Sequence, residues 1–143
     1  MAIDIKEPAM GVELKKSDID LGIVTRNPEP MLAFYRDILG FRFEASLDMP
    51  GGTTMHRLWC GDSLIKILQH EKEPAGEAPP GGIAGATGYR YWTMTVSNLD
   101  EVTQACADSG HKVVVTPREI RPGVKISIVE DPDGNWVEFL ENS

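Results

Sequence analysis

The second half of this 143-residue chain repeats the first half, and no other feature limits its possible folds as strongly. The stretch YWTMTVSNLDEVTQACADSG aligns with DLGIVTRNPEPMLAFYRDILG, which pairs Asp20 with Tyr91 at an offset of 71 residues. The last strand of each half aligns at an offset of 72, which pairs Lys66 with Glu138. The repeat predicts two similar modules, residues 18–70 and 89–141.

Each copy shows the order strand, helix, strand, strand, strand, from period-2 and helical spacing of its apolar residues. In the first copy the strands are expected at 19–26, 41–47, 53–59 and 63–69. Its helix should begin at Pro28 behind an Asn27 cap and end at Gly40. In the second copy the strands are expected at 89–96, 112–116, 124–129 and 135–140. Its helix should follow Ser97 or Asn98 and end at Gly110.

The whole chain of 143 residues reads as one domain, in which an N-terminal tail at 1–17 and a connector at 71–88 flank the modules. The connector is rich in Pro and Gly and predicts either a linker or a mobile flap.

Composition excludes some functions. A net charge of −8 argues against nucleic acid or an anionic membrane as a partner. The first residues, MAIDIKEPAM, lack the apolar run of a signal peptide, and Cys60 and Cys106 lack C-x-x-C spacing. We therefore expect reduced cysteines and a cytoplasmic protein.

Sorting strand residues by parity separates two faces of the expected sheets. One face is apolar throughout, as where helices cover it: Leu21, Ile23, Ile65, Ile67, Trp92, Met94, Val96, Val137 and Phe139. The other is mixed: Asp20, Gly22, Val24, Lys66, Leu68, Tyr91, Thr93, Thr95, Trp136, Glu138 and Leu140. A mixed face is typical of a partly desolvated ligand cavity, although a solvated face with scattered apolar residues would give a similar pattern.

Two stretches carry a resemblance. PEPMLAFYRDILGFRF holds a helix ending in F-Y-x-x-x-L-G-F, and EDPDGNWVEFLE holds D-P-x-G-N-x-x-E. With the repeated modules, they resemble the vicinal oxygen chelate superfamily of glyoxalases, bleomycin-resistance proteins and extradiol dioxygenases, over residues 18–141. The resemblance implies an α+β fold in which two βαβββ modules form a curved mixed sheet around a cavity, with helices on the outer face. It also implies a homodimer.

In that superfamily four equivalent strands each supply one metal ligand. The matching positions here are Asp20, Lys66, Tyr91 and Glu138, and only Glu138 matches the usual ligand types. Because the Lys66 ammonium would repel a cation, we predict no cofactor; if a divalent metal does bind, Glu138 and Asp20 are its expected ligands.

We predict that Lys66 takes the electrostatic place of the metal, neutralising the carboxylates of Asp20 and Glu138. Glu138 or Asp20 would act as base, and Tyr91 or Lys66 as proton donor. The same charges could instead form a salt-bridge network without chemistry.

Further side chains on or near the mixed face are candidates for contact with a substrate: Trp136, Trp59, Arg57, Thr93, Leu68 and His70. Trp136 could stack on an aromatic ligand, and Arg57 could bind a carboxylate or phosphate. For His70, a solvated histidine at a strand end is the alternative.

Three functions remain open from sequence, all with a small-molecule ligand as the expected partner. The first is a metal-independent lyase or isomerase acting on a small carbonyl compound. The second is a non-catalytic drug- or metabolite-binding protein of the bleomycin-resistance type, and the third is a metalloenzyme with unusual ligands.

Overall fold

The computed structural model describes residues 11–143. Residues 1–10 lie outside that range. Most of the predicted N-terminal tail, and the stretch for which we predict no signal peptide, therefore lie outside the described residues.

The first module contains the predicted strand, helix and three strands. Its elements are β1 (Leu21–Val24), α1 (Pro28–Leu32), η1 (Ala33–Ile38), β2 (Arg42–Met49), β3 (Thr53–Cys60) and β4 (Ser63–His70). The second module repeats the order with β5 (Tyr91–Thr95), α3 (Leu99–Asp108), β6 (Val113–Arg121), β7 (Val124–Glu130) and β8 (Trp136–Asn142). Between them, the connector holds one short helix, α2 (Gly82–Gly85).

The first helix begins at Pro28 as predicted, but its cap differs. The Asn27 side chain makes no capping hydrogen bond, and the Asn27 amide donates to Thr25 Oγ1 over 2.9 Å. From Ala33 the helix widens into a π-helical turn, in which the Leu39 amide donates to the Phe34 carbonyl five residues back. Gly40 then ends it with a φ of 76°.

The second helix is capped by a residue from a distant strand. The Asn98 side chain makes no cap, and the Leu99 amide donates to Glu141 Oε1, at the end of β8, over 2.8 Å. β6 continues to Arg121 instead of ending at residue 116, with Pro117 inside it. Proline is tolerated because β6 is an edge strand.

Among the described residues the strands form two four-stranded mixed sheets with the same topology. Their orders are β1-β4-β3-β2 and β5-β8-β7-β6, with the first pair of each sheet parallel and the others antiparallel. This repeat confirms the predicted α+β fold of two βαβββ modules.

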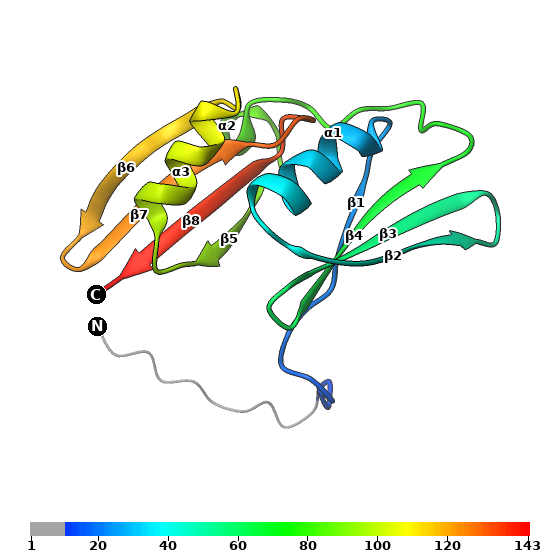
Figure 1. Ribbon diagram of the computed structural model, residues 1–143, viewed down its shortest axis with the longest axis horizontal. Coiled ribbons are helices and arrows are strands. Elements are labelled where there is room, and N and C mark those ends of the chain that lie inside the picture. The colour runs from blue at the N-terminus through cyan, green and yellow to red at the C-terminus, as the bar shows by residue number, and fades with distance from the viewer. Residues whose placement is uncertain (1–10) are drawn as a thin grey trace.

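The apolar faces of both sheets join one core. Ile65, Ile67, Val137 and Phe139 belong to this core, and the other five residues of the predicted apolar face pack against it. Helix α3 covers the second sheet, and the α1–η1 helix lies toward the middle of the molecule, near the first sheet (Figure 1). The two long helices of the modules therefore occupy the apolar side of the sheets, and the mixed faces are left open apart from the short helix α2, which rests on Trp136.

Candidate functional site

The open faces, by which we mean the sheet faces turned away from the core, hold the predicted site residues. Register places Lys66 opposite Gly22 of β1 and Arg57 of β3, and Glu138 opposite Thr93 of β5 and Ile128 of β7. The two faces are only partly covered: Val24 is 54% exposed and Tyr91 49%.

On the first open face, Asp20 is held between two lysines. Lys16 Nζ lies 2.6 Å from Asp20 Oδ1, and Lys66 Nζ lies 3.7 Å from Asp20 Oδ2. The hydrogen bond from Lys16, with the charges of both lysines, lowers the pKa of Asp20. The carboxylate is therefore ionised and engaged at neutral pH.

On the second open face, Glu138 accepts a hydrogen bond from Thr93 Oγ1 over 2.7 Å. Tyr91 lies two residues before Thr93 and pairs in register with Trp136. Across residues 11–143, no hydrogen bond or ion pair joins Glu138 or Tyr91 to Asp20 or Lys66. Of the four predicted catalytic residues, only Asp20 and Lys66 are therefore joined by an ion pair, whereas Tyr91 and Glu138 lie on neighbouring strands of the other sheet.

The donor set does not suit a divalent metal. The ammonium groups of Lys16 and Lys66 each bind one oxygen of the Asp20 carboxylate. A metal ion would need the same oxygens as ligands and would be repelled by the two positive charges. Nor does the described part of the chain contain a group of three or more His, Cys, Asp and Glu side chains arranged around a metal-sized site.

The predicted substrate-contact residues of the first module lie along β3 and β4. Arg57 Nε and Trp59 Nε1 both donate to Glu44, over 2.5 and 2.8 Å. Leu68 is half-buried beside Gly22, and His70 Nδ1 lies 2.7 Å from Thr53 Oγ1. His70 also lines a pocket of about 390 Å³ at the far end of the sheet.

Trp136 packs against the connector. A Cβ added to Gly82 would lie 2.1 Å from the Trp136 ring, so the connector backbone rests directly on the indole. Arg90 fixes the same segment by donating to the carbonyls of Gly82 and Pro79 over 2.7 and 2.6 Å. One face of Trp136 is therefore covered.

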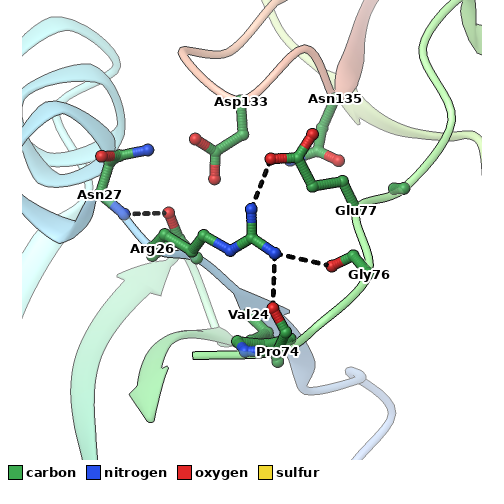
Figure 2. A pocket seen from close by; sticks show the side chains of 10 residues that line it. Val24, Arg26, Asn27, Pro74, Gly76, Glu77, Asp133 and Asn135 are labelled. Atoms are coloured by element: carbon green, nitrogen blue, oxygen red, sulfur yellow. Dashed lines mark hydrogen bonds and ion pairs between the residues drawn. The ribbon is translucent and has the colours of Figure 1, made fainter. Parts of the chain in front are cut away.

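A pocket of about 450 Å³ opens where the connector passes the end of β1. Figure 2 shows Arg26 in its centre, reaching the Glu77 carboxylate and the carbonyls of Pro74 and Gly76. Asp133 and Asn135, from the turn before β8, also line it. The Arg26 guanidinium therefore ties the connector to the end of β1 inside this pocket.

Both sequence motifs meet in one buried contact. The Tyr35 hydroxyl of the F-Y motif donates to Asp131 Oδ2 of the D-P-x-G-N motif over 2.7 Å. Asp131 also accepts from the amides of Asp133 and Asn135 and from the Asn135 side chain, each over 2.9 Å. These motifs therefore build the fold by joining the two modules.

Sequence reasoning missed Lys16 and Glu44 as members of the site. The spacing of Lys16 and Asp20, four residues apart, was the only local signal for the first. Glu44 sits in a bulge of β2 between Phe43 and Ala45, a feature that strict alternation does not show.

Comparison with known families agrees with this architecture. Residues 19–139 match the model of the Glyoxalase/Bleomycin resistance protein/Dioxygenase superfamily. The chain belongs to this superfamily.

Solved structures of the glyoxalase superfamily share the fold. A putative glyoxalase family protein from Bacillus anthracis is 23% identical, with a TM-score of 0.66 over 94% of this chain and 100% of that one. A glyoxalase family protein from Bacillus cereus reaches a TM-score of 0.79 at 17% identity, over 94% and 99% of the two chains. One from Enterococcus faecalis is 22% identical, with a TM-score of 0.64 over 90% and 97%.

No curated protein sequence matches this glyoxalase-superfamily chain significantly. Among its described helices none is long and apolar enough to cross a membrane. Its cysteines are unpaired in the described residues, and burial raises the pKa of the Cys106 thiol to about 11, which keeps that thiol un-ionised and unreactive.

Proposed function

We propose that this protein binds a small organic molecule against the open faces of its sheets without a metal ion. The observation that carries the proposal is the ion pair between Lys66 and Asp20, with 3.7 Å between Nζ and Oδ2. These residues stand at two of the four positions where the superfamily resemblance implies metal ligands. A lysine-neutralised carboxylate there supports recognition of a polar ligand group by fixed charges and hydrogen bonds.

Binding is favoured over proton abstraction by the environment of Asp20. A general base works best when its pKa lies near the working pH. The Lys16 hydrogen bond lowers the pKa of Asp20, which makes this carboxylate a weaker base. Its position suits the task of holding two lysines in place.

We further propose that a second copy of the chain completes the binding cavity. The open faces expose apolar side chains, among them Val24 at 54% and Leu47 at 42%. Ligand cavities bury most of their ligand against apolar walls, so an added surface is needed to enclose a small molecule here.

The test is ligand binding before and after removal of metals. We would treat the full-length protein with EDTA, measure its metal content, and screen a library of small carbonyl compounds, acids and amines by thermal shift. Ligands should raise Tm equally with and without EDTA. Lys66→Ala and Glu138→Ala should reduce the shift, whereas Lys72→Ala, on the exposed connector, should not. Binding lost with EDTA and restored by Zn²⁺ would contradict the proposal.

A lyase or isomerase activity on a small carbonyl compound is the second candidate, and Glu138 favours it. Its one side-chain partner within residues 11–143 is the Thr93 hydroxyl, so no cation neutralises this carboxylate. Incubating each bound compound with protein and following it by NMR would reveal turnover. Product formed by the wild type and absent with Glu138→Gln would favour the enzyme, and unchanged compound throughout would favour the binding protein.

A further inference from the structure

The first open face carries a concentration of positive charge that the rest of the chain does not suggest. The whole protein has a net charge of −8. On this face seven side chains form one connected group, which we call the basic cluster: Lys16, Asp20, Arg42, Glu44, Arg57, Trp59 and Lys66. Its four cations exceed its two carboxylates, so the cluster is positive within an acidic protein.

Trp59 is the centre of the basic cluster. Lys16 Nζ lies 5.5 Å from the centroid of its ring, and Arg42 Cζ lies 5.8 Å from it, both within the range of cation–π attraction. The Trp59 indole donates to Glu44 Oε1 over 2.8 Å. The Trp59 ring therefore attracts two cations, and its indole N–H holds the carboxylate that binds a third, Arg57.

Two cations of the basic cluster stand directly opposite each other. Arg57 and Lys66 are register partners on β3 and β4, an arrangement in which like charges repel. Glu44 offsets Arg57 over 2.5 Å, and Asp20 offsets Lys66 only at 3.7 Å while also binding Lys16. Within residues 11–143 Arg42 forms no ion pair with a carboxylate. The basic cluster therefore carries positive charge that its own carboxylates do not neutralise, and this charge can attract one more anion.

We propose that the basic cluster binds the carboxylate group of an organic acid. A guanidinium presents its N–H groups as a planar fork that fits a carboxylate, and Arg42 and Arg57 supply two such forks. This inference rests on the proposed function, because it names the chemical class of the ligand held on the open face.

Three monosubstituted benzenes of similar size and different charge test this inference. Benzoate, benzamide and benzylamine would be titrated into the full-length protein at low ionic strength, with the indole N–H resonance of Trp59 as the site-specific readout. Trp59→Phe would assign that resonance. Benzoate should bind at least about tenfold more tightly than benzamide, benzylamine should bind least, and added salt should weaken benzoate selectively.

Variants then locate the site. Arg42→Gln should weaken benzoate by about tenfold and leave benzamide unchanged, because it removes the cation without an internal ion pair. Arg121→Gln, at the exposed β6–β7 turn, is the matched control and should have no effect. Thermal unfolding would establish that both variants are folded.

The outcomes separate this inference from the proposed function. Equal affinities for benzoate and benzamide, or an Arg42→Gln variant with unchanged benzoate affinity, would overturn the carboxylate assignment while ligand binding itself stands. If no compound of the broader screen binds, the proposed function fails together with it.

Discussion

Tyr35 and Asp131 show how much one residue pair contributes to this fold. Both side chains are buried, Asp131 at 3% exposure, and they come from different modules. Burial raises the pKa of Tyr35 well above its ordinary value, with the Asp131 charge adding to the effect. The phenol is therefore a permanent donor, and Asp131 is the point at which the turn before β8 is tied to the first module.

Tyr35→Phe should destabilise the protein by about 1–3 kcal/mol, because it leaves a buried carboxylate without one donor. Denaturant unfolding would measure the loss. The control is Tyr89→Phe, since Tyr89 is fully exposed and its hydroxyl should matter little. Equal stability of Tyr35→Phe and wild type would show that the contact is dispensable.

The pH dependence of stability should carry the signature of Asp131. Burial is the largest influence on this carboxyl and raises its pKa above 3.8, against the hydrogen bonds from Tyr35 and Asn135 that lower it. Between 3.8 and the raised value the folded state binds more protons than the unfolded state. The contribution of Asp131 to stability is thus fully present below pH 3.8 and is lost as pH rises through the folded-state pKa.

Asp131→Asn isolates this contribution, because the amide does not titrate. The free energy of unfolding of the wild type minus that of the variant should fall as pH rises from about 3.5 through the raised pKa. A difference that is flat or increases with pH would contradict the assignment. Asp133→Asn, an exposed neighbour in the same turn, serves as the control.

At the scale of elements, the connector and the ends of the helices depend on distant partners. Glu141 of β8 caps α3, and Trp136 and Arg90 support the connector. Residues 71–81 are exposed, yet Arg26 binds the Pro74 carbonyl and Arg90 binds the carbonyl of Gly82, the first residue of α2. The connector is thus anchored at defined points.

Gly82→Ala should detach the connector from Trp136. The residue has a φ of +54°, and the added Cβ would lie 2.1 Å from the ring, which leaves no room for a methyl group. Limited proteolysis should cleave the connector faster in this variant. Gly76→Ala, where a Cβ meets nothing within 4 Å, should be cleaved at the wild-type rate. Equal cleavage of all three proteins would show that the contact does not hold the segment.

At the scale of the whole molecule, two modules share one core on one side and leave mixed faces open on the other. Core packing buries most of the apolar faces of the two sheets, whereas the open faces retain exposed Leu47, Val24 and Tyr91. Exposed apolar groups beside charged ones are typical of surfaces that meet a ligand or a second chain.

Leu47→Glu should weaken the proposed homodimer, because it places a charge on an open-face apolar position. Sedimentation velocity should show more monomer in the variant, with the dimer Kd raised by at least about tenfold. Ile83→Glu, on the exposed connector, is the control and should leave the assembly unchanged. A wild type that sediments as a monomer at all concentrations would exclude the dimer.

The sequence by itself determined the two modules, the order of their strands and helices, and the division into an apolar and a mixed face. These features depend on local periodicity and on an internal repeat, both of which can be read residue by residue. The repeat also aligns Lys66 with Glu138, at a position where the resemblance to the superfamily implies a metal ligand.

Only the tertiary structure decided which charges meet. Lys16 reaches Asp20 and Trp59, a bulge in β2 brings Glu44 to Arg57, and the connector covers Trp136. Of the four predicted catalytic residues, Asp20 and Lys66 form an ion pair on one sheet, while Glu138 bonds to Thr93 on the other. Strand register, bulges and the path of an irregular connector are set by packing between distant segments, and no local pattern encodes them.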